Sequence, residues 1–243
     1  MSAVRLAGGQ EFKTSVFVNA AGPMLAEVGR MLGVDIPVFN ELHLKAAFND
    51  AHGVVGRDAP LLIYTDEQEL DWSDEERAWL AEDAETHWLT GQLPSSAHVR
   101  PEGGTHAETI ILLWDLHNEP VEAVFPPPLD PMYPEIAMRG LIKLLPKLCV
   151  YLERMPKPYV DGGYYTRTQE NRPLACPLPV EGAFVIGAMS GYGIMSSPAL
   201  GELVAAHIAS ARLPDYAPYF NLNRYQDPEY QKLLDSWSDS WQL

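Results

Sequence analysis

The residues best suited to chemistry form a glycine turn between an apolar strand and a helix. Residues 183–188 are a short continuous apolar run, which is typical of a strand buried on both faces of a parallel sheet. Ser190-Gly-Tyr-Gly193 follows, and we expect its glycines to let the backbone approach a ligand and adopt dihedral angles closed to other residues. A helix is predicted from Ile194 to Ala209, and its free N–H groups favour negative charge beyond the glycines. The segment therefore predicts a socket that holds the ring of a ligand against a helix N-terminus.

The elements around this turn follow from the apolar pattern. The predicted helix has one apolar face, and Pro198 is tolerated in its first turns. A second strand is predicted at Val16–Ala21, followed by a helix that Gly22-Pro23 opens and Gly33 closes. Before it, residues 1–15 are interpreted as a short hairpin with Gly8-Gly9 at its turn. The apolar face of the helix predicted from Ile194 to Ala209 comprises Leu200, Leu203, Val204 and Ile208.

Two segments together carry a family resemblance. The block from Asp161 to Ala209, with GAMSGYGIM at its centre, resembles the C-terminal signature of the FAD-dependent oxidoreductases of the D-amino-acid oxidase superfamily, which includes sarcosine oxidase-like and glycine oxidase-like enzymes. The segment VFVNAAGP, residues 16–23, is similar to the strand and turn beside the FAD in that family. The resemblance covers nearly the whole chain and is loosest in the middle third.

The resemblance implies a cofactor, a reaction and a set of site residues. The implied reaction is oxidation of a small-molecule amine or amino-acid derivative by hydride transfer to a non-covalently bound FAD. A helix N-terminus aimed at the flavin would stabilise the negative charge that the ring gains. The alternative interpretation of the same residues is an ordinary strand, turn and helix in a core. The cofactor-binding residues that the resemblance implies are Ala21, Gly22, Pro23, Gly187, Ser190, Gly191, Tyr192, Gly193, Ile194 and Met195.

One part of the family pattern is missing from this sequence. Members open with a G-x-G-x-x-G turn that binds the FAD pyrophosphate at a helix N-terminus, and no such turn occurs here. We therefore expect the chain to correspond to the C-terminal part of such a flavoprotein and to bind FAD weakly or not at all. The alternative is a non-catalytic remnant, or an interaction module, that does not bind flavin.

The family's substrate and tether positions also differ here. The cysteine that links covalently to flavin in sarcosine oxidase-like members falls at Gly163, which excludes a link there. The lysine and the arginine that hold a substrate carboxylate in the two subgroups fall at Met195 and Tyr165. Arg100 either takes over that role or is a surface loop arginine. The candidate catalytic residues are thus Arg100 and Tyr165.

The distribution of lysines bears on the electron acceptor. In sarcosine oxidase-like enzymes a substrate-domain lysine over the flavin promotes reaction with oxygen. This chain has no lysine between Lys45 and Lys143. The resemblance therefore favours a dehydrogenase over an oxidase.

The predicted fold class is α+β, with an incomplete α/β FAD-binding part and an inserted substrate domain built on an antiparallel sheet. In the middle region, strands are predicted at Leu61–Thr65 and Thr109–Leu116, with helices between them. The predicted organisation assigns residues 1–35 and 160–225 to the discontinuous FAD-binding domain, 36–159 to the substrate domain and 226–243 to a C-terminal tail. The tail carries Tyr230, Leu233, Leu234 and Trp237 at helical spacing.

The chain is strongly acidic, with 17 basic and 33 acidic residues, which argues against nucleic acid as a partner. Ten acidic residues lie between Asp66 and Glu85. The sequence Ser73-Asp-Glu-Glu76 predicts a capping box at the start of a solvated surface helix, with Trp79 and Leu80 turned inward. An acidic interaction surface is the alternative.

Several other classes of protein find no support in the sequence. The two cysteines, Cys149 and Cys176, are unpatterned and suit buried thiols in a reducing compartment. His98, His106, Asp115 and His117 match no metal-ligand spacing, so no metal site is predicted. There is no Gly-x-Ser-x-Gly elbow, no apolar run of membrane-spanning length and no signal-peptide pattern. We expect a cytoplasmic protein, although a missing N-terminal segment would leave mitochondrial targeting open; the oligomeric state is not predicted.

Overall fold

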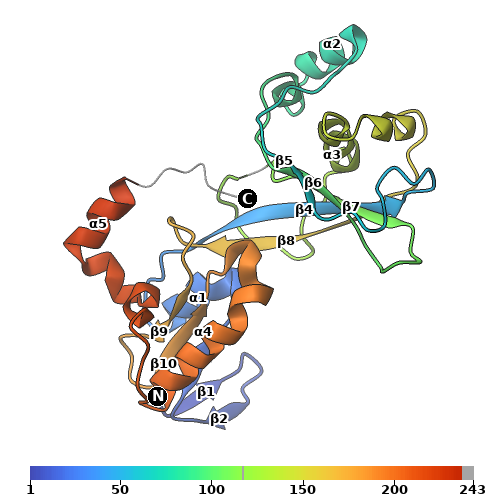
Figure 1. Ribbon diagram of the computed structural model, residues 1–243. Coiled ribbons are helices and arrows are strands. Elements are labelled where there is room, and N and C mark those ends of the chain that lie inside the picture. Colours follow the sequence, from blue (N-terminus) through green and yellow to red (C-terminus); the bar gives the residue numbers. More distant parts are fainter. Residues whose placement is uncertain (117, 237–243) are drawn as a thin grey trace. The chain divides into compact units, whose positions relative to one another are not determined.

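In a computed structural model the chain folds into two compact units (Figure 1). The structure describes residues 1–116 and 118–236. The first unit contains Met1–Glu41, Glu119–Ala123 and the described residues from Tyr164 onwards. The second contains the described residues of Leu42–Asn118 and Val124–Gly163. Both units mix helices and strands, so the predicted α+β class is confirmed.

The first unit is built on a three-stranded sheet with the order β3-β10-β9. Strand β10 (Ala183–Gly187) is central and runs parallel to β3 (Phe17–Asn19), with Val185 opposite Asn19. Its other neighbour, β9 (Leu174–Pro177), is antiparallel to it. The prediction that residues 183–188 form a strand of a parallel sheet is therefore correct for one neighbour only, since the sheet is mixed.

Helices cover both faces of this sheet. Because side chains alternate along a strand, Ala183 and Val185 share a core with Leu25 of helix α1 (Leu25–Met31). Phe184 contacts the opposite core, which includes Leu203 of helix α4 (Gly193–Ile208). The result is a three-layer arrangement in which β10 is covered on both sides (Figure 1). Leu200 and Val204 are also buried as predicted, but Ile208, in the last turn of α4, is 38% exposed and does not belong to the core face.

The remaining parts of the first unit follow the sequence pattern. Strands β1 (Ala3–Arg5) and β2 (Glu11–Lys13) form the predicted hairpin, with Gly9 left-handed at its turn. Helix α5 (Pro228–Asp235) lies in the predicted tail. It buries Tyr230 and Leu234 and leaves Leu233 exposed, so the predicted apolar face is narrower than expected. Trp237 lies outside the described residues. Short 3-10 helices span Gly22–Met24, Ser190–Tyr192, Ala217–Phe220 and Leu222–Gln226.

The second unit is built on a five-stranded sheet with the order β5-β6-β7-β4-β8. The pairs β5–β6, β6–β7 and β7–β4 are all antiparallel, which agrees with the predicted antiparallel-rich middle region. The division between the two units falls within β4 and within β8. The strands are β5 (Leu62–Tyr64), β6 (Ala97–Pro101), β7 (Thr109–Leu113), β4 (Phe39–Asn49) and β8 (Tyr159–Arg167). Two further 3-10 helices span His87–Thr90 and Pro146–Tyr151.

Helix α3 (Tyr133–Ile142) packs on this sheet through its apolar residues. Trp114 is fully buried and lies against α3 at Gly140, where an added Cβ would come within 2.3 Å of the indole ring. The hydroxyl of Tyr133 donates a hydrogen bond to the Leu44 carbonyl and accepts one from the Trp114 amide. These contacts join the helix to β4 and to the residue that follows β7.

The acidic helix α2 (Asp74–Glu82) has the predicted capping box, with hydrogen bonds between Ser73 and Glu76 in both directions. Leu80 is buried as expected, but Trp79 is 60% exposed. Consecutive residues on a helix point about 100° apart, so only one of this pair can face the core. Cys149 is likewise exposed, against the expectation of two buried thiols, whereas Cys176 is buried.

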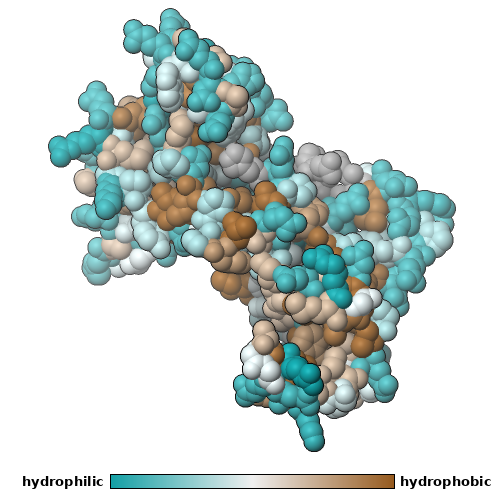
Figure 2. All heavy atoms as spheres, turned by 180° about the vertical axis from the view of Figure 1, so that it is seen from behind, coloured by the Kyte–Doolittle hydropathy of each residue, from teal (hydrophilic) through white to brown (hydrophobic). Residues whose placement is uncertain are grey.

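Apolar side chains reach the surface at several places on the face shown in Figure 2. Two exposed apolar residues, Ile194 and Met195, belong to the first turn of α4. Among the described residues, no helix is long and apolar enough to span a membrane.

Candidate functional site

Two strand, turn and helix segments of the first unit end at the same edge of its sheet. Because β3 and β10 are parallel and in register, their carboxyl ends lie side by side. The turn after β3 leads into α1, and the turn after β10 leads into α4. Ligands of open α/β sheets bind at such carboxyl edges. The sequence-predicted residues Ala21 to Pro23 and Gly187 to Met195 are thus brought together at one edge of the first unit.

The first turn is fixed by Asn19, which is buried at the end of β3. Its Nδ2 donates to the Leu25 carbonyl at 2.9 Å, and its Oδ1 accepts from the Ala21 amide at 3.3 Å. Gly22 has a left-handed backbone with φ of 55°, and an added Cβ would meet no atom within 4 Å. The hydrogen bonds of Asn19 therefore fix the turn, while Gly22 adjoins open space.

In the second turn, the left-handed dihedral angles occur at residues other than the two glycines. Ala188 and Ser190 are left-handed, with φ of 56° and 51°. Gly193 is helical, with φ of −52°, and Gly191 is not among the residues of positive φ. The expectation that the two glycines adopt dihedral angles closed to other residues is wrong. Each left-handed non-glycine residue costs about 1 kcal/mol, and such strain is concentrated at functional turns.

The glycines of this segment lie in two different kinds of surroundings. An added Cβ at Gly191 would lie 3.0 Å from the ring of Tyr165, and one at Gly187 would lie 2.9 Å from the Leu25 side chain. Both glycines therefore allow close packing within the chain. At Gly193 the nearest atom would be Met189 Cβ at 3.9 Å, an ordinary contact distance. Space at Gly193 is thus not used by the chain itself.

The first turn of α4 combines a helix N-terminus with exposed apolar side chains. Ile194 is 95% exposed and Met195 is 74% exposed. The first N–H groups of a helix have no partner within the helix and carry partial positive charge. An apolar ring with a negatively polarised edge matches both properties. This combination is the strongest feature of the edge.

Pro23 borders a hollow in the first unit next to the first turn. The hollow has a volume of about 340 Å³ and is lined by Pro23, Met24, Asn40 and Val121, among others. The Asn40 side chain donates to the Pro23 carbonyl at 3.0 Å and accepts from Thr166 at 2.7 Å. The turn is therefore braced against β8 on this side.

The two predicted catalytic residues lie in different units. Tyr165 is on the β8 portion of the first unit, with its ring against Gly191. Arg100 is on strand β6 of the second unit and is ion-paired with Glu102, so it is not a loop residue. The hydrogen bond and the charge of Arg100 hold the pKa of Glu102 below its usual range. The Arg100 guanidinium is therefore already engaged by a carboxylate.

The residues weighed as metal ligands form no cluster in the part of the chain that the structure describes. Asp115 contacts His43 at 2.6 Å, and the ring of His98 contacts the Ser96 carbonyl at 3.0 Å. His117 lies outside the described residues. Gly163, at the family's tether position, has no atom within 4 Å of an added Cβ.

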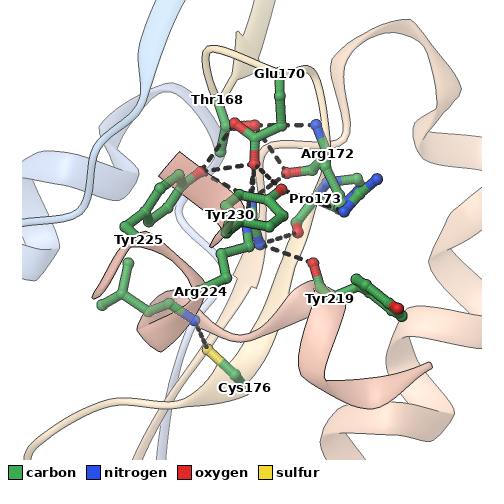
Figure 3. A network of polar contacts seen from close by, with 10 residues as sticks. Thr168, Glu170, Arg172, Pro173, Cys176, Tyr219, Arg224, Tyr225 and Tyr230 are labelled. Atoms are coloured by element: carbon green, nitrogen blue, oxygen red, sulfur yellow. Dashed lines mark hydrogen bonds and ion pairs between the residues drawn. The ribbon is translucent and has the colours of Figure 1, made fainter. Parts of the chain in front are cut away.

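A buried ionic network in the first unit was not foreseen from the sequence (Figure 3). Glu170 and Arg224, both almost fully buried, are 2.7 Å apart. The hydroxyls of Tyr225 and Tyr230 donate to Glu170 at 3.0 and 2.9 Å. The two charged residues are 54 positions apart, and no local pattern links them. The network joins the segment between β8 and β9 to the C-terminal helical segment.

The network shifts the pKa values of its members. Burial alone would raise the pKa of Glu170, but the Arg224 charge and the hydrogen bonds of its neighbours hold it below its usual range. Burial raises the pKa of Tyr225 and Tyr230, and their hydrogen bonds to Glu170 act in the same direction. At neutral pH the carboxylate is ionised and both phenols are protonated. The cluster is thus a stable ionic crosslink.

Comparison with solved structures shows which folds this chain resembles. No protein-family model and no curated protein sequence matches the chain. L-Proline dehydrogenase from P. horikoshii matches with a TM-score of 0.63 and 17% identity, over 93% of this chain and 50% of that one. Glycine oxidase from Geobacillus kaustophilus gives 0.60 and 17%, over 91% and 48%. Iminodiacetate oxidase from Chelativorans sp. BNC1 gives 0.62 and 12%, over 90% and 49%.

These likenesses define the class of fold. The chain spans about half the length of the solved structures that it matches. It has part of the fold of these three enzymes, and the fold that the sequence resemblance implied is confirmed.

Proposed function

We propose that this chain forms part of an FAD-dependent oxidoreductase that oxidises a small-molecule amine or amino-acid derivative by hydride transfer to flavin. The observation that carries the proposal is the shared edge of β3 and β10, where two turns meet beside the exposed first turn of α4. The fold shared with the proline, glycine and iminodiacetate enzymes supports it.

The residues at the edge fit the ring of a flavin. Gly22 and Gly193 adjoin space that no part of the described chain fills closely. The N–H groups at the start of α4 suit the polar edge of the ring, while Ile194 and Met195 suit its apolar surface. Bound there, flavin would supply the hydride acceptor. In this proposal Ala21, Pro23, Ser190 and Tyr192 hold the shape of the two turns.

The diphosphate of FAD has no comparable site in this sequence. The G-x-G-x-x-G turn that would present backbone N–H groups to it is absent. The chain by itself would therefore bind FAD weakly, mainly through the ring. Residues 1–35 and 160–225 would form the cofactor part, residues 36–159 the substrate part and residues 226–243 the tail.

The family's usual carboxylate anchors are replaced by Met195 and Tyr165, so the substrate is an amine or a derivative rather than a simple amino acid. Arg100 is paired with Glu102 through Nη1, so a substrate carboxylate would bind its other guanidinium nitrogens or displace Glu102. Lys45, which precedes the stretch without lysines, forms an ion pair of 3.1 Å with the Asp161 carboxylate. A lysine held in this way supports a dehydrogenase rather than a fast oxidase.

The proposal is tested by measuring separately how the chain binds the flavin ring and how it binds the diphosphate part of FAD. Purified chain is titrated with riboflavin, FAD and ADP, with binding followed by quenching of flavin fluorescence or by calorimetry. We expect riboflavin and FAD to bind with affinities within roughly tenfold of each other, and ADP not to bind. FAD that binds far more tightly than riboflavin would contradict the missing diphosphate site. Absence of riboflavin binding would favour the alternative, a module that does not bind flavin.

Two matched variants locate the ring. Gly193→Val places a branched side chain at the edge, where the chain itself leaves space, so folding is retained. Gly201→Val changes the same helix at a position where an added Cβ meets no atom within 4 Å. We expect the first variant to weaken riboflavin binding at least about fivefold and the second to leave it unchanged. Equal affinity in both variants would exclude this edge as the ring site.

A further inference from the structure

One segment of the second unit carries a charge opposite to that of the protein as a whole. Residues 143–159 lead from the end of α3 to the first residue of β8 (Figure 1). The chain has 17 basic and 33 acidic residues, yet Glu153 is the only acidic residue of this segment. The segment is therefore a local positive region on an acidic protein. Its basic residues are Lys143, Lys147, Arg154 and Lys157.

The four basic side chains of this segment are not used inside the protein. All four residues are exposed, and none of them forms an ion pair or a side-chain hydrogen bond with another described residue. By contrast, Lys45, Arg100 and Arg139 of the same unit are each paired with a carboxylate. A cation without a partner attracts an external anion without having to give up an existing ion pair.

The inner side of the segment is fixed by apolar packing. Leu148 and Tyr151, three residues apart in the 3-10 helix Pro146–Tyr151, are buried in the core of the second unit. A 3-10 helix has three residues per turn, so this pair forms one ridge and the two other ridges face outwards. The segment is thus held on one core, and its exposed residues lie on the side away from it. Further residues of the segment that pack on this core are Leu144, Leu145 and Met155.

The outward side of the segment combines apolar side chains with the charges. Val150 is 42% exposed and follows Lys147 by three residues, so the two share one ridge of the 3-10 helix. Leu152, directly after this helix, is 37% exposed, and Tyr159 is 68% exposed at the start of β8. Apolar side chains next to cations suit a partner with an anionic surface and an apolar interior.

We propose that residues 143–159 bind the surface of a bilayer that contains anionic lipids. Clusters of about four to eight lysine and arginine residues are attracted to anionic headgroups. Val150 and Leu152 would contact the acyl boundary, while Tyr159 has the apolar ring and polar tip that are frequent at membrane interfaces. The aliphatic stems of the lysines lie along this apolar region while their ammonium groups stay among the headgroups. The proposal does not depend on flavin binding.

The acidic remainder of the chain does not cancel this local attraction. Charges farther apart than about 8 Å are largely screened at physiological salt. Within the segment Glu153 opposes four positive charges, and Asp50, which accepts a hydrogen bond from the Tyr151 hydroxyl, is buried. A positive excess remains, and it turns this segment, rather than the acidic helix α2, toward the bilayer.

The test is co-sedimentation of the full chain with lipid vesicles. One preparation contains phosphatidylcholine and phosphatidylglycerol in a ratio of roughly two to one, and the other contains phosphatidylcholine alone. We expect binding to the mixed vesicles to weaken as salt is added, and binding to the neutral vesicles to be at least about tenfold weaker. Equal binding to both preparations, or binding to neither, would overturn the proposal.

Matched charge variants then locate the contact. Lys147→Ala combined with Lys157→Ala removes two charges of the segment, and Lys13→Ala combined with Arg30→Ala removes two exposed charges of the first unit. We expect the first pair to weaken binding to the mixed vesicles roughly ten- to thirtyfold and the second pair to leave it unchanged. All four positions are exposed, so the fold is retained, which thermal unfolding verifies. Equal binding by the two double variants would place the contact elsewhere and refute the proposal.

Two further measurements separate the apolar contribution and the competing occupant. Tyr159→Ala should weaken vesicle binding roughly two- to tenfold, whereas Tyr216→Ala, at a 51% exposed position of the first unit, should not change it. Sedimentation velocity without vesicles tests whether the segment instead meets the acidic residues 66–85 of a second copy. Salt-sensitive self-association that Lys147→Ala with Lys157→Ala abolishes, without vesicle binding, would assign the surface to that second copy and overturn the proposal.

Discussion

The carboxylate of Glu170 and the guanidinium of Arg224 lie 2.7 Å apart with almost no exposed surface. One residue precedes β9 and the other belongs to the helical segment after α4. Their pairing closes the first unit, because it links its sheet to the segment that leads into α5 (Figure 3). Because of this pairing, the Arg224 guanidinium is not available to bind a ligand.

Removing Arg224 should destabilise the protein strongly. Arg224→Met keeps much of the volume but leaves the Glu170 charge buried without its partner, which costs about 3–5 kcal/mol. Urea unfolding measures the loss. Lys232→Met removes an exposed ion pair with Glu229 nearby and should change the free energy of unfolding by less than about 1 kcal/mol. Similar losses in the two variants would mean that Glu170 is solvated.

The stability of the protein should depend on pH through Glu170. The pKa of Glu170 in the folded protein lies below the ordinary value of a glutamate, 4.5. Its contribution is therefore fully present above that value and is lost as the pH falls through the lowered folded pKa. Urea unfolding between roughly pH 6 and pH 3 should show a steeper loss for the wild type than for Glu170→Gln. Parallel curves would contradict the lowered pKa.

Glycine replacement should have opposite effects in two helices. In Gly140→Ala the new Cβ would lie 2.3 Å from the buried Trp114 ring, and such overpacking costs about 1–3 kcal/mol. In Gly201→Ala the Cβ meets nothing within 4 Å, so the better helix propensity of alanine should stabilise by about 0.5–1 kcal/mol. Thermal unfolding compares the two. If Gly140→Ala left the stability of the protein unchanged, the Trp114 ring would be free to move away from the helix.

Loss of the capping box should loosen the start of α2. In Ser73→Ala the Glu76 amide loses its acceptor at 3.2 Å, which costs about 0.5–2 kcal/mol. Hydrogen exchange of the Glu76 amide should accelerate accordingly. Ser73→Asp supplies another good N-cap and should keep the protection close to that of the wild type. Unchanged exchange in the alanine variant would mean that tertiary contacts alone hold this helix end.

Much of the local structure is determined by the sequence itself. The apolar run before Ser190 and the segment VFVNAAGP each become a strand followed by a turn and a helix, because strand propensity, glycine and helix periodicity agree there. The capping box at Ser73 and the hairpin at Gly9 form for the same local reason. Strand ends were predicted less well; Thr109–Leu116, for example, is a strand only to Leu113.

Only the tertiary structure decided the details that give the site its shape. The left-handed residues of the second turn are Ala188 and Ser190 rather than the glycines, and an added Cβ at Gly191 would lie 3.0 Å from the Tyr165 ring. Trp79 is exposed because Leu80 occupies the one inward direction available. Glu170 and Arg224 are paired across 54 residues. Such long-range contacts depend on packing in three dimensions, which no local pattern of residues encodes.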